Sequence, residues 1–348
     1  MRNILFNKRG FLLLVLSVSA TSLIVSTETG PRGVVDEMQL IHEELIAAGP
    51  AGSLAGTLTM PVEGHMLDKD VPVLLFVPGS GPTDRHGNSP LGVSAAPYRL
   101  LAEALAAQGY PSLRIDKRGM FGSENAIPDP NDVTIAAYAE DLASWAKAVQ
   151  GRLPVTSGTR CVIPVGHSEG GLVALAAMAN MTNPCGLVLI ASPGRPLDAV
   201  IREQLHANPA NAPFLDEADV ALAALKRGQQ IDPLSLRPEL RTLFAAQVQG
   251  YLIDAFSHDP VELAAQIDVP MLVVQGTRDL QVRDVDAVML AEANPRSKLA
   301  LLPEVNHVLK IVASEDPQAN LTTYGDPTLP IARTAVDAVS QFLYQLSR

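Results

Sequence analysis

One short turn sequence, GHSEG at residues 166–170, constrains the fold of this chain more than any other feature. Residues 161–165 before it are apolar and β-prone, and residues 171–179 after it are small, apolar and helix-forming. The pattern G-x-S-x-G between a buried strand and a helix is typical of a nucleophile elbow, a tight turn that lifts a serine hydroxyl above the sheet. The sequence therefore predicts that Ser168 is a nucleophile placed at the N-terminus of a helix.

Strand-like and helix-like segments alternate along most of the chain. Such alternation predicts an α/β fold built on a mostly parallel, doubly wound sheet with right-handed crossovers. Residues 53–60 alternate between apolar and polar and are expected as a hairpin strand at a sheet edge. The expected buried strands are 72–77, 112–116, 161–165, 187–191, 271–275 and 299–302, and the expected helices are 98–108, 131–150, 171–179, 284–293 and 331–346.

The block from residue 196 to residue 266 breaks the alternation, because it is amphipathic and helical with no convincing strand. We expect it to form a helical cap inserted over the elbow. Aromatic residues in this block recur at helical spacing. Phe244, Tyr251 and Phe256 are predicted to bind substrate in an acyl pocket; the alternative is that they pack the cap onto the core.

The N-terminal segment has the composition of a targeting sequence. Three basic residues among the first nine precede an uncharged apolar run, which is the secretory pattern. Residues 1–27 are expected to be a signal peptide or, alternatively, an uncleaved membrane anchor. Residues 28–52 are expected as a spacer, and residues 53–348 as the main domain. The protein is therefore predicted to be exported, to the periplasm or beyond the cell, with no membrane contact except through this segment.

Charge and ligand spacing argue against two classes of protein. The formal net charge of −11 argues against a nucleic-acid partner, because phosphate binding needs clustered Lys and Arg. No C-x-x-C or H-E-x-x-H spacing occurs, so neither a metal nor another cofactor is expected.

The two cysteines, Cys161 and Cys185, each begin a predicted strand. These strands flank the elbow helix and are expected to be parallel neighbours, about 4.8 Å apart. That spacing is compatible with a disulfide, which an exported protein would form under oxidising conditions. We therefore predict a Cys161–Cys185 disulfide, the alternative being two buried free thiols.

A serine nucleophile needs a histidine base and a carboxylate that orients the histidine. On such an elbow the chain order is Ser, then Asp or Glu, then His, with each residue in a loop after a strand. Asp279 follows the strand 271–275 and is the predicted acid. Its rivals, Asp284 and Asp286, are expected on the next helix. His307 follows the strand 299–302 and is the predicted base, whereas His86 and His167 are expected as loop or wall residues.

The tetrahedral intermediate of acyl transfer also needs backbone N–H donors. One is predicted to be the N–H of Glu169, directly after the nucleophile. The other is expected in the loop PGSGP at residues 78–82, from Ser80 or, as the alternative, from Gly81.

Four motifs in this order resemble those of bacterial α/β-hydrolases of the serine-aminopeptidase-like esterase group. The loop 78–88 is similar to a P-G-S-G-P-T-D-R-D-G-N loop, although His86 stands where Asp is common. Residues 116–123 resemble a D-K-R-G-x-G-x-S loop, with two residues (Met and Phe) in place of one. Residues 276–282 and 306–310 resemble the acid and histidine loops. The resemblance covers about residues 53–346 and implies the α/β-hydrolase fold and carboxylesterase activity.

The function predicted from these observations is hydrolysis of small acyl esters through an acyl-enzyme. An aminopeptidase or a thioesterase would use the same triad, so both remain alternatives. A third alternative, a non-catalytic binding protein of the same fold, would be expected to have lost a triad residue, and none is lost. Dehalogenase and epoxide-hydrolase chemistry would need Asp in place of Ser168.

Overall fold

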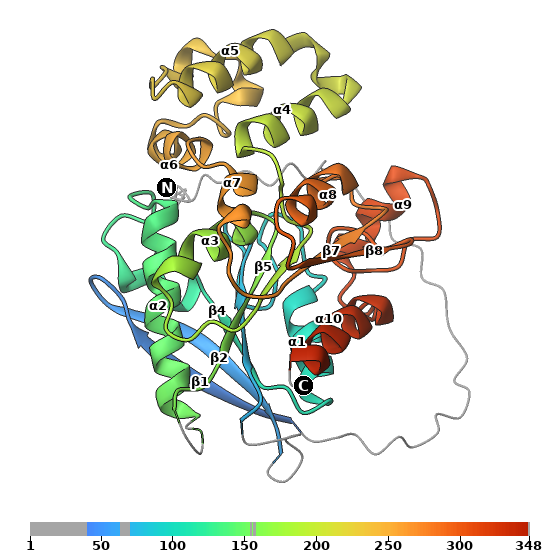
Figure 1. Ribbon diagram of the computed structural model, residues 1–348. Helices are drawn as coiled ribbons and strands as arrows, with labels where there is room; N and C mark the ends of the chain where they lie inside the picture. Colours follow the sequence, from blue (N-terminus) through green and yellow to red (C-terminus); the bar gives the residue numbers. More distant parts are fainter. Residues whose placement is uncertain (1–39, 63–69, 154, 156–157, 347–348) are drawn as a thin grey trace, which may run out of the picture.

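The computed structural model describes residues 40–62, 70–153, 155 and 158–346. Its centre is an eight-stranded sheet in the order β1-β2-β4-β3-β5-β6-β7-β8 (Figure 1). Strand β2 pairs antiparallel with β1 and β4, and the pairs from β4 to β8 are parallel. The predicted mostly parallel α/β sheet is thereby confirmed. The strands are β1 (Leu40–Ala48), β2 (Ser53–Pro61), β3 (Val73–Val77), β4 (Ser112–Ile115), β5 (Val162–His167), β6 (Leu187–Ile190), β7 (Met271–Gly276) and β8 (Ser297–Leu302).

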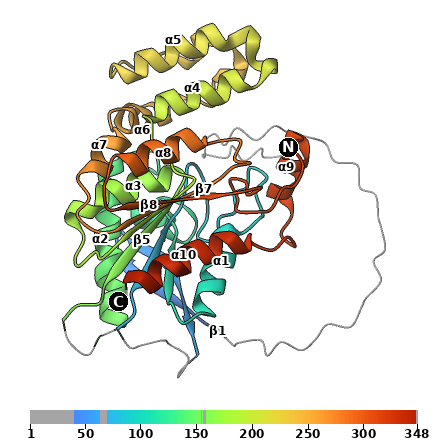
Figure 2. The same cartoon turned by 45° about the vertical axis from the view of Figure 1, so that its right-hand side comes forward.

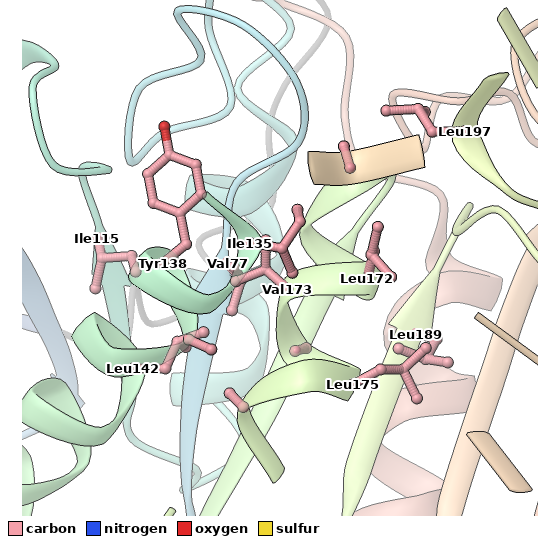
Figure 3. Packing of buried hydrophobic residues seen from close by; sticks show 14 of the residues in the cluster. Val77, Ile115, Ile135, Tyr138, Leu142, Leu172, Val173, Leu175, Leu189 and Leu197 are labelled. Carbon is pink, nitrogen blue, oxygen red and sulfur yellow. The ribbon is translucent and has the colours of Figure 1, made fainter. Parts of the chain in front are cut away.

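Helices cover both faces of the sheet (Figure 2). The burial of strand β3 reflects this arrangement. Its side chains point alternately to opposite faces of the sheet, and all of them are buried, so both faces must be covered. Val73, Leu75 and Val77 join the core beneath α2 and α3, whereas Leu74 and Phe76 join the core beneath α1 and α10. Figure 3 shows the first of these cores. The helices are α1 (Pro97–Ala106), α2 (Ile135–Arg152), α3 (Glu169–Ala177), α8 (Asp284–Glu292), α9 (Pro317–Thr322) and α10 (Arg333–Leu346).

The helices between β6 and β7 stand outside these layers, above one end of the sheet (Figures 1 and 2). They are α4 (Leu197–Ala207), α5 (Leu215–Lys226), α6 (Ala246–Phe256) and α7 (Pro260–Ala265), and we call them the cap. Several polar contacts tie the cap, and the segment just before α4, to the rest, among them a hydrogen bond from the Gln204 amide of α4 to the Gln281 carbonyl at 2.9 Å. The Arg195 guanidinium binds Asp286 of α8 at 2.7 Å, and the Ile135 N–H at the start of α2 donates to Asp254 of α6 at 2.7 Å.

Short 3₁₀ helices complete the connections. They are η1 (Phe121–Ala126), η2 (Met178–Asn180), η3 (Pro209–Phe214), η4 (Pro233–Ser235), η5 (Pro238–Leu240) and η6 (Thr323–Gly325).

The prediction that residues 28–52 form a spacer is wrong for residues 40–48, which form the edge strand β1. This strand pairs with β2 along its whole length through a turn at residues 49–52. Its central residues are polar and charged, a composition that suits a sheet edge because it discourages pairing with other chains. Two ion pairs also connect the hairpin to the rest of the domain: Glu43 binds Arg152, and Glu44 binds Arg85. The proposed signal segment, residues 1–27, lies outside the described residues.

A disulfide joins Cys161 to Cys185, with the two Cα atoms 5.7 Å apart. Cys161 immediately precedes β5 and Cys185 lies two residues before β6. A bridge between Val162 and Pro184 holds the two segments side by side. The bond therefore lies at the end of the sheet opposite the elbow.

Candidate active site

Ser168 occupies the turn between β5 and α3 with φ 55° and ψ −129°, a conformation that non-glycine residues rarely adopt. Its N–H donates to the Ile190 carbonyl of β6 at 2.9 Å. A methyl group at Gly166 would overlap the Gly170 carbonyl, and one at Gly170 would overlap the Val77 carbonyl of β3. The two glycines of the motif are thus required by the close approach of strand and helix, and the turn between them holds the serine above the sheet.

Asp279 and His307 come together from the loops after β7 and β8. His307 Nδ1 lies 2.8 Å from Asp279 Oδ2, and both side chains are buried. The N–H groups of Gln281 and Val282 donate to the other carboxylate oxygen at 2.7 and 3.0 Å. Burial opposes ionisation of Asp279, but the attraction of His307 and these hydrogen bonds outweigh it and lower the pKa of Asp279. An ionised carboxylate only accepts, so Nδ1 carries the proton and Nε2 is left as the basic nitrogen.

The rival acids lie elsewhere. Asp284 is at the exposed start of α8, where its carboxylate accepts from the Val285 N–H. Asp286 is fully buried and binds Arg195 and the Gly194 N–H. Neither carboxylate contacts His307, so of the three only Asp279 is placed to orient the His307 ring.

Ser168 and His307 open into one narrow cavity of about 40 Å³. Its walls come from the loop after β3, helix α1, the acid and histidine loops, and the segment after α9. Within the described part of the chain no hydrogen bond joins the Ser168 hydroxyl to the His307 ring; such bonds often tighten only when substrate binds. The cavity is lined by Gly79, Ser80, Thr83, Gly87, Ser89, Val93, Pro97, Tyr98, His167, Ser168, Gln281, His307, Val308 and Tyr324.

The loop after β3 lies directly against the nucleophile. A Cβ built on Gly79 would lie 3.1 Å from Ser168 Cβ, so glycine lets the backbone lie close to Ser168 without crowding. Ser80 lines the cavity, and its carbonyl accepts from the Thr83 hydroxyl at 2.9 Å. Glu169 begins α3, where backbone N–H groups point away from the helix. The two predicted donors, Ser80 and Glu169, therefore flank Ser168.

A buried chain of hydrogen bonds connects the walls of the cavity. The Gly79 N–H donates to the Tyr98 hydroxyl at 3.2 Å, and that hydroxyl lies 2.9 Å from His167 Nδ1. His167 Nε2 lies 2.8 Å from the His307 carbonyl. A carbonyl can only accept, so Nε2–H donates to it and Nδ1 accepts from Tyr98. Burial, followed by repulsion from His307, lowers the pKa of His167 to about 3, so its ring is neutral near pH 7.

Comparison with known proteins agrees with this architecture. A model of the alpha/beta hydrolase family matches residues 74–321, more than half of the chain. The chain belongs to the alpha/beta hydrolase family.

Other alpha/beta hydrolases resemble it over most of its length. It is 28% identical over 262 residues to esterase EstD of Thermotoga maritima, a match spanning 74% of this chain but only 58% of EstD. The solved structure of Est1E from Butyrivibrio proteoclasticus with ferulic acid superposes with a TM-score of 0.54 at 18% identity, covering 87% of this chain and 100% of Est1E. The solved structure of the Pyrococcus furiosus esterase Pf2001 superposes with a TM-score of 0.51 at 16% identity, covering 91% of this chain and 99% of Pf2001. These two structures support the fold.

Two loops that the sequence singled out contact each other in this hydrolase. Arg85 of the loop after β3 forms a two-pronged ion pair with Asp116 of the loop after β4, at 2.8 and 3.0 Å. The Arg85 N–H also donates to Asp116 at 2.9 Å. Asp116 thereby holds the β3 loop in place beside Ser168. His86 accepts from Arg114 at 2.6 Å and faces a separate cleft.

The prediction that Phe244, Tyr251 and Phe256 line the substrate pocket is not supported by their position. None of the three lines the cavity at Ser168. All are buried, between 0% and 3% exposed, in the core that joins cap and main domain. Tyr251 of α6 packs edge-on against Tyr138 of α2, with ring centroids 6.1 Å apart. Their helical spacing reflects packing of the cap, which was the alternative interpretation.

Sequence reasoning did not assign several cavity residues, among them Tyr98, Gln281 and Tyr324. Tyr324 lies in η6, and its hydroxyl lies 3.2 Å from the Gln281 amide. Neither α9 nor η6 was expected, because residues 313–330 have no strong periodicity. Tyr98 opens a helix that the sequence did predict, but only the packing of α1 brings its hydroxyl to the elbow.

Residues 40–62, 70–153, 155 and 158–346 lack two further features. No group of three or more His, Cys, Asp or Glu side chains there is placed to hold a metal ion. None of the helices in these ranges is both long enough and apolar enough to span a membrane.

Proposed function

We propose that this alpha/beta hydrolase is a serine esterase that cleaves small acyl esters through an acyl-enzyme. The observation that carries the proposal is the 2.8 Å contact between His307 and the ionised Asp279, next to a serine held in a strained turn on the same cavity. The match to a protein named as an esterase supports the reaction class.

The proposed mechanism follows from the positions of these groups. The Ser168 hydroxyl attacks the ester carbonyl carbon while its proton moves to His307 Nε2. Asp279 holds the opposite nitrogen and stabilises the imidazolium that forms. The carbonyl electrons move to oxygen, and the N–H groups of Ser80 and Glu169 stabilise the resulting oxyanion. Collapse expels the alcohol, which takes the proton from His307, and water then releases the acyl group by the same steps.

The size of the cavity supports a small acyl group. Its volume of about 40 Å³ is only a few times the roughly 10–15 Å³ that a cavity needs to hold a single water molecule. Val93, Val308 and the ring of Tyr324 bound this space. We therefore expect a preference for an acetyl or similar group, because a long acyl chain would need these walls to move.

An aminopeptidase would need an unpaired carboxylate to bind the substrate ammonium. The cap carries four acidic residues that could take that role, Glu203, Asp216, Glu217 and Asp219, and three of them are paired with arginine. Glu203 binds Arg195 at 2.5 Å, Glu217 binds Arg237 at 3.1 Å, and Asp219 binds Arg202 at 3.3 Å. None of the four lines the cavity at Ser168, which favours an ester over a peptide substrate.

A substrate panel tests the proposal. p-Nitrophenyl esters from acetate to decanoate, the corresponding thioesters and aminoacyl-arylamides are compared for wild type and Ser168→Ala. We expect turnover to be fastest with acetate or propionate, and Ser168→Ala to lose about 10⁴-fold or more. A fluorophosphonate should label wild type once, at Ser168, and should still label Ser80→Ala and Ser123→Ala. Preference for the arylamides, or labelling of Ser168→Ala, would contradict the proposal.

Export is proposed on separate grounds. The basic and apolar pattern of residues 1–27 is that of a secretory signal. The Cys161–Cys185 disulfide supports it, because disulfides persist mainly in oxidising compartments. Fractionation of the native host followed by mass analysis of the mature N-terminus tests this proposal; intact residues 1–27 in a cytosolic fraction would contradict it.

A further inference from the structure

Lys117 is a buried cation that the proposed mechanism does not use. It follows strand β4 and is only 4% exposed. Its ammonium donates to the Gly79 carbonyl at 2.6 Å, lies 3.8 Å from the Glu169 carboxylate, and lies 5.5 Å from the centre of the Tyr138 ring. Glu169 is equally buried, at 3% exposed. Burial lowers the pKa of Lys117, whereas the Glu169 carboxylate opposes this shift, and the aromatic face of Tyr138 also favours the charged form.

The carbonyl that Lys117 binds belongs to the same peptide group as the Ser80 N–H. In a trans peptide the carbonyl and the N–H point in opposite directions, and the described residues contain no cis peptide bond. With the Gly79 carbonyl directed at Lys117, the Ser80 N–H points the other way. Ser80 and Gly79 both line the cavity at Ser168. Lys117 thus fixes the orientation of this peptide from its far side.

A positive charge at a carbonyl oxygen also changes the peptide electronically. It draws electron density toward oxygen and away from nitrogen, so the N–H on the opposite side becomes a stronger donor. Hydrogen bonds in a chain polarise one another in this way, and the effect is larger where water is excluded. The peptide is preorganised before substrate arrives, which is the condition under which donors stabilise a transition state most.

Fold stability is by itself a weak reason for an ammonium at this place. Burying an ammonium and a carboxylate costs several kcal/mol, and well-packed apolar residues often replace such a pair without loss. The Lys117–Glu169 separation of 3.8 Å is longer than a hydrogen bond, so the recovered attraction is incomplete. What the pair does achieve is a link between the two oxyanion donors: Lys117 binds the peptide of one, and Glu169 carries the other on its own backbone.

We propose that Lys117 is a positioning residue that orients and polarises the Gly79–Ser80 peptide, so that the Ser80 N–H binds the oxyanion more strongly than it binds the ground-state ester. This inference rests on the proposed function, because it assigns a role within the same oxyanion hole. Lys117 acts through the peptide and does not line the cavity.

The test uses an inhibitor that forms an oxyanion. An alkyl trifluoromethyl ketone accepts the Ser168 oxygen at its carbonyl carbon, the serine proton moves to His307, and the carbonyl electrons become an alkoxide. The non-fluorinated ketone binds without this addition and reports ground-state binding. Lys117→Met removes the charge and the donor with an unbranched side chain of similar length, Lys117→Gln keeps a neutral donor, and Lys117→Arg keeps the cation.

We expect Lys117→Met to lower kcat about 10- to 100-fold, less than loss of a direct oxyanion donor. The dissociation constant of the trifluoromethyl ketone should rise by the same factor, while KM and binding of the plain ketone change little. The kcat of Lys117→Gln should lie between those of Lys117→Met and wild type, and Lys117→Arg should keep most of the activity. If Lys117→Met does not fold, Lys117→Gln decides the question, and wild-type kcat in either neutral variant would overturn the inference.

Arg160 provides the matched control. It is also buried and donates to two backbone carbonyls, those of Leu153 and Val71, each at 2.6 Å. It precedes β5 at the end of the sheet opposite Ser168. Arg160→Met should lower the melting temperature yet leave the ratio of the two ketone constants as in wild type. If Lys117 were purely structural, Lys117→Met would also lower the melting temperature without changing the ratio of the two ketone constants. That result would overturn the inference.

Failure of this inference is distinct from failure of the proposed function. If Ser168→Ala stays active, the esterase mechanism itself is wrong. If Ser168 is labelled and required, but loss of the Lys117 charge weakens both ketones equally, only the role assigned to Lys117 is wrong.

Discussion

The ring of His167 donates a hydrogen bond to the backbone carbonyl of His307 at 2.8 Å, so the residue before the nucleophile holds the loop of the base. The two rings lie 4.6 Å apart. His167 can make this bond and accept from Tyr98 only while it is neutral with its proton on Nε2. The contact thus couples the geometry of the active site to the protonation of a buried ring.

Acid should destabilise the protein through His167. Its folded-state pKa of about 3 lies below the usual value of 6.5, so the unfolded chain binds the extra proton first. The neutral ring's contribution is fully present above pH 6.5 and is lost as pH falls toward 3, at about 1.4 kcal/mol per pH unit. His167→Gln can keep both hydrogen bonds without titrating.

Urea unfolding at pH 6.5, 5.5 and 4.5 measures this effect. We expect the free energy of unfolding to fall less steeply with acid in His167→Gln than in wild type. His206→Gln, which alters an exposed histidine of the cap, controls for the loss of one imidazole. Equal pH slopes for wild type and His167→Gln would show that His167 is not buried as a neutral ring.

Asp279→Asn should leave a folded protein with kcat lowered about 10⁴-fold, because an amide no longer fixes the required tautomer of His307. Steady-state kinetics with p-nitrophenyl acetate, alongside circular dichroism, measure both properties. Asp284→Asn is the control and should keep wild-type turnover. If Asp279→Asn kept it too, the acid would have to be another residue.

Tyr324→Ala should shift ester preference toward longer acyl chains, because Tyr324 forms one wall of the cavity. Tyr251→Ala should instead lower stability by about 3–5 kcal/mol, as expected for truncation of a buried aromatic side chain, with little change in preference. Chain-length profiles and melting temperatures of the two variants separate these effects. A changed profile in Tyr251→Ala would restore the cap as part of the substrate pocket.

Reduction should destabilise the protein. The Cys161–Cys185 bond closes a loop between residues 24 apart, which corresponds to about 3 kcal/mol in the chain-entropy model. Unfolding with and without dithiothreitol measures the loss, and the double variant Cys161→Ala/Cys185→Ala should be insensitive to the reagent. Thiol titration of the denatured, unreduced protein should find no free thiol; two would contradict the bond.

Much of the architecture could be predicted because local sequence and tertiary environment agree there. Strands buried on both faces are usually continuously apolar, as β3 and β6 are, and such runs are easily recognised in a sequence. The Ser168 turn could also be predicted from the sequence, because its two glycines, Gly166 and Gly170, are required by close contacts with neighbouring backbone. Chain order then pointed to Asp279 and His307, which the structure brings to 2.8 Å.

The edge strand β1 could not be read in the same way. Its exposed face and charged residues resemble a solvated linker, and it becomes a strand only because β2 offers a pairing edge. Glu43 and Glu44 find their partners on distant segments, Arg152 and Arg85. The formation of this strand therefore depends on its pairing with β2, which the local sequence pattern does not reveal.

The sequence by itself determined the elbow, the order of the triad and the alternation that builds the sheet, because each depends on residues close together in the chain. Only the tertiary structure decided what surrounds Ser168. Tyr98, Gln281 and Tyr324 meet at the cavity from three distant segments, while Tyr251 turns into the core. Periodicity shows that a side chain is buried, but which surface it is buried against depends on how the cap and the loops pack, and that is fixed by contacts distant in sequence.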